Sequence, residues 1–136
     1  MNENQIHREI IEEHARNPIG NAKLEVFTHE NSFQSEKTGN ICHLRFLMRE
    51  DEILEIGYHL QGSALALASA SIMACQIKGL SILDAKSLSN LLIEFIEGEQ
   101  SISLPEEMEV YETIRRFPAR HDCALLPWRT FCKAIE

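Results

Sequence analysis

Positive charge is scarce in this sequence. Its 136 residues include 13 Lys and Arg against 21 Asp and Glu, which gives a formal net charge of −8. The basic residues are scattered along the chain, so no basic patch is predicted and no nucleic-acid partner is expected. The sequence also lacks a secretory apolar segment and an apolar run long enough to span a membrane. We therefore expect a cytoplasmic protein with no membrane partner.

Several common catalytic and nucleotide-binding motifs are missing as well. There is no P-loop and no glycine-rich dinucleotide fingerprint. No serine stands in a Gly-x-Ser-x-Gly context, which argues against hydrolase chemistry on Ser63. The four cysteines, which form no Cys-x-x-Cys pair, are predicted to be free thiols in a cytoplasmic chain. A small buried apolar role is the simplest expectation for three of them, Cys42, Cys75 and Cys132.

The most informative segment that is present follows Gln61. Residues 62–76 contain no charged side chain and are rich in Ala, Leu and Ser. Because a surface helix would carry charge on one face, this segment is predicted to be a helix buried on most sides. Gly62 and Ser63 would begin it. Free backbone N–H groups at such a helix start favour an anion, a thiolate or a metal-bound ligand.

The remaining periodicity predicts an α+β fold in one domain over residues 1–136, with helices packed on one face of a three-stranded antiparallel sheet. In the second strand, alternation directs Cys42 to the core and His43 to the other face. Residues 29–37 are predicted to be a polar loop whose His29, Ser32 and Ser35 face water. The expected strands are 24–27, 42–48 and 53–60, around a hairpin tip at 49–52. The expected helices are 3–16 (with Ile6, Ile10 and Ile11 on one face), 63–78, 81–97, one starting at Pro105, and 123–135 with Pro127 near its start; residues 100–105 are an expected loop.

Two segments carry a resemblance to a known family. They are Gly62-Ser63 with Ala68-Ser-Ala-Ser71, and Phe117-Pro-Ala-Arg-His-Asp-Cys-Ala-Leu-Leu-Pro-Trp128. Together with Asn17-Pro18 after the first helix, they make the chain similar to the NifU/IscU/SufU family of iron–sulfur cluster scaffold proteins. The helix at 84–97 and its loop resemble the insert of the SufU branch. The resemblance implies a three-stranded sheet covered by helices and a role in cluster assembly.

The resemblance also implies where a metal site would stand. In the family, three cysteines and an aspartate hold zinc or a nascent cluster. The corresponding positions here are Thr38, Asn40, Ser63 and Cys123, with Gly39 between the first two. Neutral hydroxyls and amides are poor ligands for zinc or iron compared with thiolates. The degenerate set therefore predicts that the usual metal site is lost and that no cofactor is bound.

Three functions stay open at this point. In the first, the protein docks a cysteine desulfurase or another assembly protein, or carries sulfur on Cys123. This thiol is expected just before a helix and close to Arg120; Asp122 opposes its activation, and an inert inherited thiol is the alternative. A sulfur relay on Cys123 would be the most enzyme-like activity expected of such a protein. In the second, Cys123, His121 and His59 rebuild a zinc or iron site. In the third, the fold is reused as a non-metal binding module.

Overall fold

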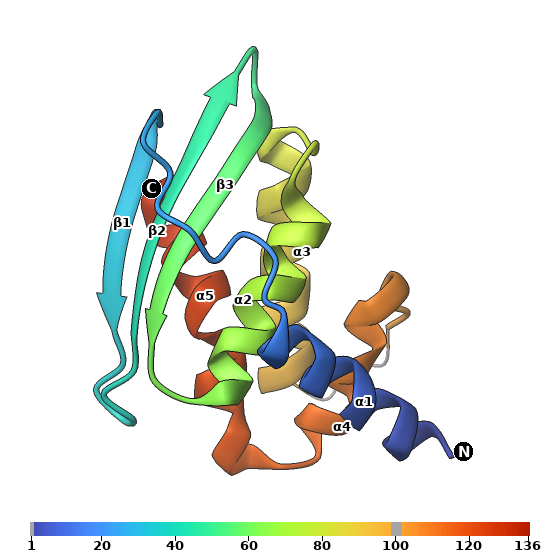
Figure 1. The fold of residues 1–136 in the computed structure, drawn as a ribbon. Coiled ribbons are helices and arrows are strands. Elements are labelled where there is room, and N and C mark those ends of the chain that lie inside the picture. Colours follow the sequence, from blue (N-terminus) through green and yellow to red (C-terminus); the bar gives the residue numbers. More distant parts are fainter. Residues whose placement is uncertain (1, 99–101) are drawn as a thin grey trace.

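The computed structural model describes residues 2–98 and 102–136 of the chain. A three-stranded antiparallel sheet forms one side of the molecule, and helices cover one of its faces (Figure 1). This confirms the predicted fold class. The elements are α1 (Glu3–Arg16), β1 (His29–Gln34), β2 (Ile41–Arg49), β3 (Glu52–Gln61), α2 (Ala64–Ile77), α3 (Ile82–Glu97), the 3-10 turn η1 (Glu106–Glu109), α4 (Val110–Arg115), the 3-10 turn η2 (Pro118–Arg120) and α5 (His121–Ala134).

The first strand does not lie where the sequence pattern placed it. β1 occupies residues 29–34, inside the expected loop, whereas residues 24–27 form no strand. The inner face of β1 is largely polar, which conceals the alternation from a hydrophobicity pattern. His29 stacks on Phe46 with ring centroids 4.7 Å apart, and Asn31 donates to the carbonyl of Thr130 on α5 at 3.2 Å. Tertiary contacts therefore make this segment a strand.

The sheet otherwise follows the predicted meander. β2 pairs with both β1 and β3 in antiparallel register. Cys42 is fully buried and His43 is exposed, as alternation predicted. The hairpin tip between β2 and β3 places Glu50 and Asp51 at positive φ, and both are exposed.

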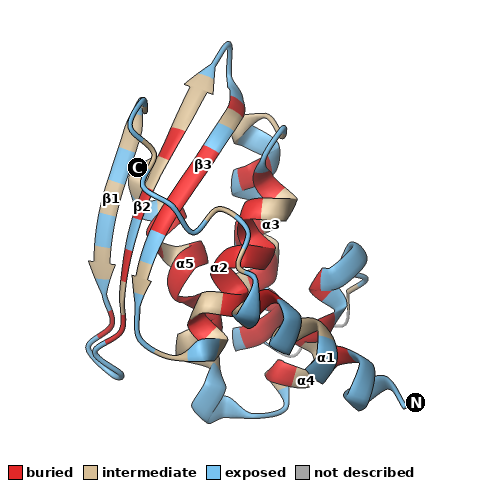
Figure 2. Ribbon diagram, viewed as in Figure 1, coloured by how far each residue is buried: buried red, intermediate tan, exposed pale blue. Residues whose placement is uncertain are grey.

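Helix α2 is enclosed on nearly every side, as its lack of charge predicted. Ser63 caps it by accepting a hydrogen bond from the backbone N–H of Ala66 at 3.1 Å. The helix packs against α1, α5 and β3, and most of its residues are buried (Figure 2). Small Ala and Ser side chains let these neighbours approach closely, so α2 is the centre around which the other elements pack.

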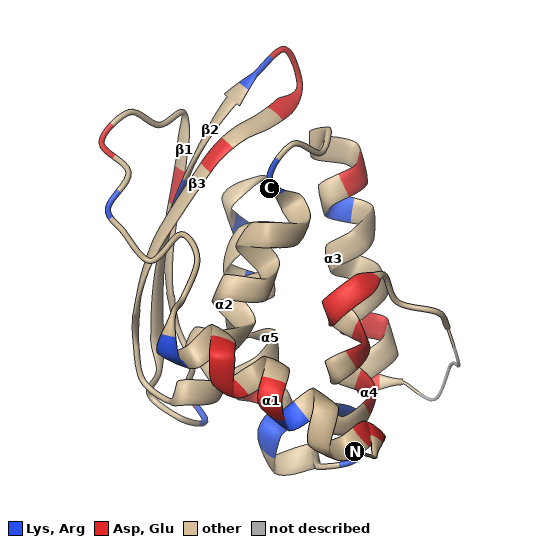
Figure 3. Cartoon of the chain, turned by 45° about the vertical axis from the view of Figure 1, so that its right-hand side comes forward, with Lys and Arg blue, Asp and Glu red and all other residues tan. Residues whose placement is uncertain are grey.

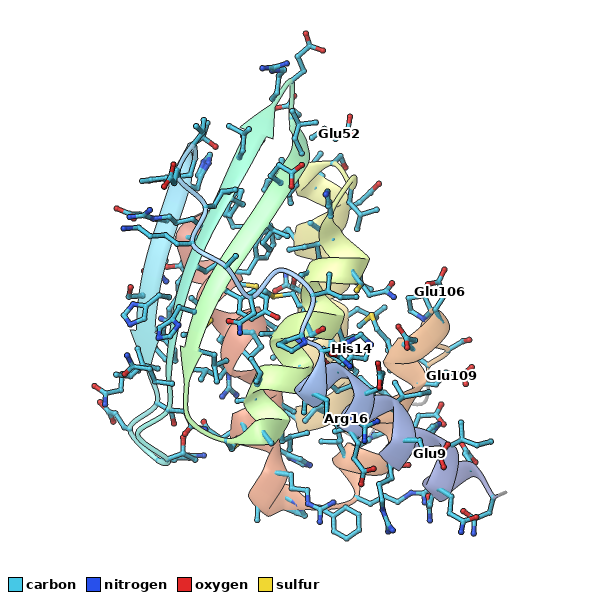
Figure 4. The ribbon with its side chains drawn as sticks, viewed as in Figure 1. Glu9, His14, Arg16, Glu52, Glu106 and Glu109 are labelled. Carbon is cyan, nitrogen blue, oxygen red and sulfur yellow. The ribbon has the colours of Figure 1, made fainter. Side chains whose placement is uncertain are left out.

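Helix α1 packs on the core through Ile10 and Ile11 and also through a buried histidine, His14. The expected face of Ile6, Ile10 and Ile11 is only partly correct, because Ile6 is 45% exposed whereas His14 is 5% exposed. His14 lies at the end of α1 that is nearest α2 (Figure 4). It makes hydrogen bonds at Nδ1 with Ser71 of α2 (2.6 Å) and at Nε2 with Glu107 of η1 (3.1 Å). Polar partners satisfy the buried imidazole, so the core accepts it.

The helices after α2 were predicted with mixed success. Ser81 caps α3 and Gly98 follows its end, as expected. The helix expected from Pro105 is instead a 3-10 turn followed by the short α4. The last helix begins at His121, because η2 leads directly into it, so Pro127 lies inside α5 and not near its start. Part of the expected loop at 100–105 lies outside the described residues. Within the described ranges, no helix is long and apolar enough to cross a membrane.

A buried chain of hydrogen bonds joins α2, α4 and α5. The indole N–H of Trp128 donates to the Tyr111 hydroxyl at 3.0 Å. Tyr111 in turn bonds to the Ser69 hydroxyl at 2.6 Å, and Ser69 donates to the carbonyl of Ala124. Burial raises the pKa of Tyr111 to about 12, so its hydroxyl stays protonated and able to donate. The network explains why a serine stands at position 69 of a buried helix.

Removing the central hydroxyl of this network should destabilise the fold. In Tyr111→Phe, the Trp128 N–H and the Ser69 hydroxyl each lose a partner in the core, and we expect a loss of about 1–3 kcal/mol in the free energy of unfolding. Urea denaturation followed by tryptophan fluorescence measures it. Ser87→Ala, at an exposed position of α3, is the control. Equal stability of the Tyr111→Phe and Ser87→Ala variants would contradict the structural role of the network.

Candidate functional site

Three segments that are distant in sequence meet at one end of the helical layer. They are the turn between β1 and β2, the N-terminus of α2 and the first turn of α5. The side-chain amide of Asn40 joins them, since its Nδ2 lies 3.3 Å from the Cys123 sulfur and 3.5 Å from the Ser63 hydroxyl. The structure thus brings together three of the four positions that the family resemblance singled out.

The fourth position, Thr38, lies in the same β1–β2 turn. Its hydroxyl accepts from the backbone N–H of Asn40 at 3.3 Å. The turn closes through a hydrogen bond from Ser35 N–H to the Asn40 carbonyl at 2.9 Å, with Gly39 at a φ of +79°. Ser35, which was expected to face water, is 4% exposed, and its Oγ accepts from the N–H groups of Lys37 and Thr38. That expectation was wrong because the turn folds inward over α5.

Asp122 fastens this turn to α5. One of its carboxylate oxygens accepts from the hydroxyls of Ser35 and Thr38, the latter at 3.3 Å. The other oxygen pairs with Arg129, which lies seven residues (about two helical turns) further along α5, at 3.4 Å. Neither Ser35 nor Arg129 was predicted to belong to this site. The one signal in the sequence is the seven-residue spacing of Asp122 and Arg129, about two helical turns, which places both on one face of a helix.

Gly62 lets the turn approach the start of α2. Its φ is +152°, a conformation that residues with a side chain rarely adopt. A Cβ atom placed there would lie 2.2 Å from Oδ1 of Asn40. Glycine is therefore required for Asn40 to reach Ser63 and Cys123.

Cys123 is the half-buried thiol of this site. It lies in the first turn of α5, and not before the helix as expected. The side-chain amide of Asn40 directs an N–H toward this sulfur. A hydrogen bond of this kind is stronger when the acceptor sulfur carries negative charge. Burial raises the pKa of the Cys42 thiol to about 11. Burial also raises the pKa values of Cys75 and Cys132.

The other residues singled out in the sequence do not face the Asn40–Ser63–Cys123 contact. His59 lies on the outer face of the sheet, where its ring stacks against His43 at 6.1 Å beside a hollow of about 530 Å³. His121 Nε2 bonds to the carbonyl of Arg115 at 2.7 Å. The guanidinium of Arg120 lies over the Phe117 ring, 4.4 Å from its centre.

The side chains at this site do not fit a zinc ion or an iron–sulfur cluster. Cys123 is the one thiol among the four family positions, and the other three offer neutral oxygen or nitrogen atoms that already hydrogen-bond to protein groups. Across residues 2–98 and 102–136, no group of three or more His, Cys, Asp or Glu side chains is placed to hold a metal ion. Hydrogen bonds to Asn40, and not coordination to a metal ion, join these side chains in the structure.

Comparison with known proteins gives a consistent family. Residues 6–124 match the NifU-like N-terminal domain. The chain is 29% identical over 137 residues to the zinc-dependent sulfurtransferase SufU of Bacillus subtilis, with 96% of this chain and 89% of that protein covered. It is 24% identical over 135 residues to the iron–sulfur cluster assembly scaffold protein IscU of Streptococcus pyogenes, with 98% and 84% covered.

Solved structures support the fold. A putative iron–sulfur cluster assembly scaffold protein for the SUF system from Fervidobacterium islandicum superposes with a TM-score of 0.87 at 23% identity, covering 99% of this chain and 100% of that one. The N-terminal part of a nitrogen-fixing NifU-like protein from Brucella abortus gives a TM-score of 0.84 at 22% identity, covering 97% and 93%. At these identities the likeness concerns the fold alone.

If the site has lost only its ligand chemistry, restoring that chemistry should restore metal binding. The triple variant Thr38→Cys, Asn40→Asp, Ser63→Cys would place three thiolates and a carboxylate around one point, and we expect it to retain about one zinc ion per chain after dialysis. Elemental analysis measures the zinc. The same variant with Cys123→Ser is the control and should retain much less. A triple variant that folds yet retains no more zinc than the wild type would show that the four positions do not converge as described.

Proposed function

This chain belongs to the NifU-like N-terminal domain family, and we propose that it acts in iron–sulfur cluster assembly by docking a cysteine desulfurase and relaying sulfur on Cys123. The supporting observation is the position of Cys123. It is the one family ligand position that is still a thiol, it is half-buried at the junction of three segments, and an amide N–H points at its sulfur. The proposal assigns no cluster or zinc ion to the site, because the donor set does not fit one.

The proposed transfer is a thiol exchange. The Cys123 thiolate attacks the outer sulfur of a persulfide on the desulfurase, a sulfur–sulfur bond forms at Cys123, and the desulfurase cysteine leaves as a thiolate. The protein then carries the extra sulfur as a Cys123 persulfide. Asn40 is suited to orient this sulfur, since its amide donates to Sγ.

The charge of Asp122 next to Cys123 would oppose a thiolate. Its carboxylate is already engaged, however, by two hydroxyl donors and by the guanidinium of Arg129. This pairing directs the negative charge toward the β1–β2 turn and offsets it, which lowers its cost to an anionic sulfur at Cys123. Arg129 is therefore a better candidate for supporting the thiol than Arg120, which stacks on Phe117.

A rebuilt metal site with His121 and His59 receives no support from the placement of these residues, which was described above. A non-metal binding module is the remaining alternative, and it would show neither desulfurase binding nor a persulfide. We further propose that the chain functions as one domain in the cytoplasm, in keeping with its relatives' roles in cluster assembly.

The sulfur relay predicts a persulfide at one position. Incubation of the protein with the cysteine desulfurase of the same organism and cysteine should add one sulfur atom to Cys123, detected by alkylation and peptide mass spectrometry. Cys123→Ser should remove the modification. Cys42 should stay unmodified in the folded protein because its buried thiol has a pKa near 11 and is closed to solvent. Absence of a Cys123 persulfide under conditions in which the desulfurase turns over would refute the relay.

A further inference from the structure

A groove of about 400 Å³ lies between α1, α4 and the turn that leads into α5. Its apolar lining residues are Ile11, Leu65, Ile114 and Phe117. Three arginines border it, namely Arg8, Arg116 and Arg120. The groove is separate from the Asn40–Ser63–Cys123 contact but adjoins it, because Leu65 lies in the first turn of α2 just after Ser63, and Arg120 precedes Cys123 by three residues.

The charge of this groove is opposite to that of the chain. The protein carries a net charge of −8, and acidic segments stand out along the helices in Figure 3. Three of the 13 basic residues nevertheless border this one groove, where Glu12 is the sole acid among the residues that line it. Such a local concentration of one sign attracts a partner of the opposite sign.

The guanidinium groups of the groove have no carboxylate partner within the described part of the chain. Arg8, Arg116 and Arg120 are absent from its ion pairs, whereas Arg16, Arg45 and Arg129 each pair with an acid. Arg116 makes only a long contact with the Asn4 amide oxygen, at 3.4 Å. The donors of these arginines therefore remain available to an external carboxylate.

Apolar surface is exposed beside these charges. Phe117 is 45% exposed, which makes it one of the five large apolar side chains that stand out at the surface of the described residues. Arg120 covers one side of its ring. An aromatic ring flanked by arginines is a typical anchor in protein interfaces, where Phe and Arg are enriched.

From these observations we propose that the groove binds an acidic, amphipathic segment of a protein partner. Carboxylates of the segment pair with Arg8, Arg116 and Arg120, and an apolar side chain of the segment packs on Phe117 and Leu65. A partner held there lies next to Cys123. If the partner is the desulfurase, that identification rests on the proposed function; the groove and its acidic occupant do not depend on it.

The apolar residues of the groove favour a protein segment, whose apolar side chains can pack on them. A nucleic acid or an anionic lipid surface carries negative charge over a much larger area than a short segment and would meet more repulsion from the rest of this acidic molecule.

A peptide experiment tests the groove without any desulfurase. The probe is a twelve-residue peptide in which Glu and Asp surround leucines at helical spacing, and the control peptide has Lys at each acidic position. Amide chemical shifts of the full chain should change around the groove with the acidic peptide and not with the basic one. Absence of groove shifts at millimolar acidic peptide, or equal shifts with both peptides, would overturn the inference.

Charge reversal gives the second test. Arg8→Glu with Arg116→Glu, which leaves Arg120 and Cys123 intact, should weaken binding of the acidic peptide by roughly tenfold or more. Phe117→Ser should weaken it without changing net charge. Lys86→Glu, at an exposed site on α3, is the control and should bind as the wild type does. Unchanged peptide affinity in both groove variants would contradict the assignment. A wild-type dimer that these substitutions dissociate would also contradict it, because a second copy of the chain would then occupy the groove.

The same variants separate the groove from the proposed function. If the desulfurase binds the wild type, the double charge reversal should weaken that complex by a similar factor. It should not make the affinity of the complex more sensitive to salt. If the desulfurase binds every variant equally, the groove is not its docking surface, although the sulfur relay can stand. If the acidic peptide binds but the desulfurase does not, the groove inference stands and the desulfurase proposal fails.

Discussion

The Asp122 carboxylate holds the candidate site in its present form. It accepts hydrogen bonds from Ser35 and Thr38 of the β1–β2 turn and pairs with Arg129 on its own helix. These contacts fix the turn against the first turn of α5. Asn40, which closes the same turn, is thereby positioned to contact Ser63 and Cys123. Hydrogen bonds thus hold together the four side chains at the positions that the family resemblance singled out.

These hydrogen bonds join segments that a metal ion would join in a metal-binding site. Structural zinc contributes folding free energy by joining distant segments. Here the turn, α2 and α5 are joined by a carboxylate, an amide and hydroxyls, while the core around α2 is closed by apolar packing and by the Ser69–Tyr111–Trp128 chain. Gly62 allows Asn40 to approach the start of α2 closely. Cys123 is the one thiol among the four positions that the family resemblance singled out.

Much of this was predictable from sequence, for identifiable reasons. The uncharged run at 62–76 predicted α2, and the alternation of apolar and polar residues predicted β2, because both patterns reflect hydrophobic burial. β1 was missed because its inner face carries His29 and Asn31, which are held by contacts with Phe46 and Thr130 that no local pattern reveals. The helical start of α5 was misplaced because a 3-10 turn precedes it.

The site itself was predictable only through the family resemblance. That resemblance singled out Thr38, Asn40, Ser63 and Cys123, and three of them lie in mutual contact through Asn40. The roles of Ser35 and Arg129 were not predictable, since their link to Asp122 depends on how the turn and α5 pack. His59 could not be excluded by its distance in sequence from Ser63, but the pleat of β3 directs it to the opposite face of the sheet.

The central claim is that the wild-type site is held by hydrogen bonds and not by a metal. The most direct measurement is the zinc and iron content of the wild-type protein as isolated without added metal, compared with its Cys123→Ser variant. The account predicts well under one equivalent of either metal in both proteins. A stoichiometric metal in the wild type that is lost in Cys123→Ser would contradict it.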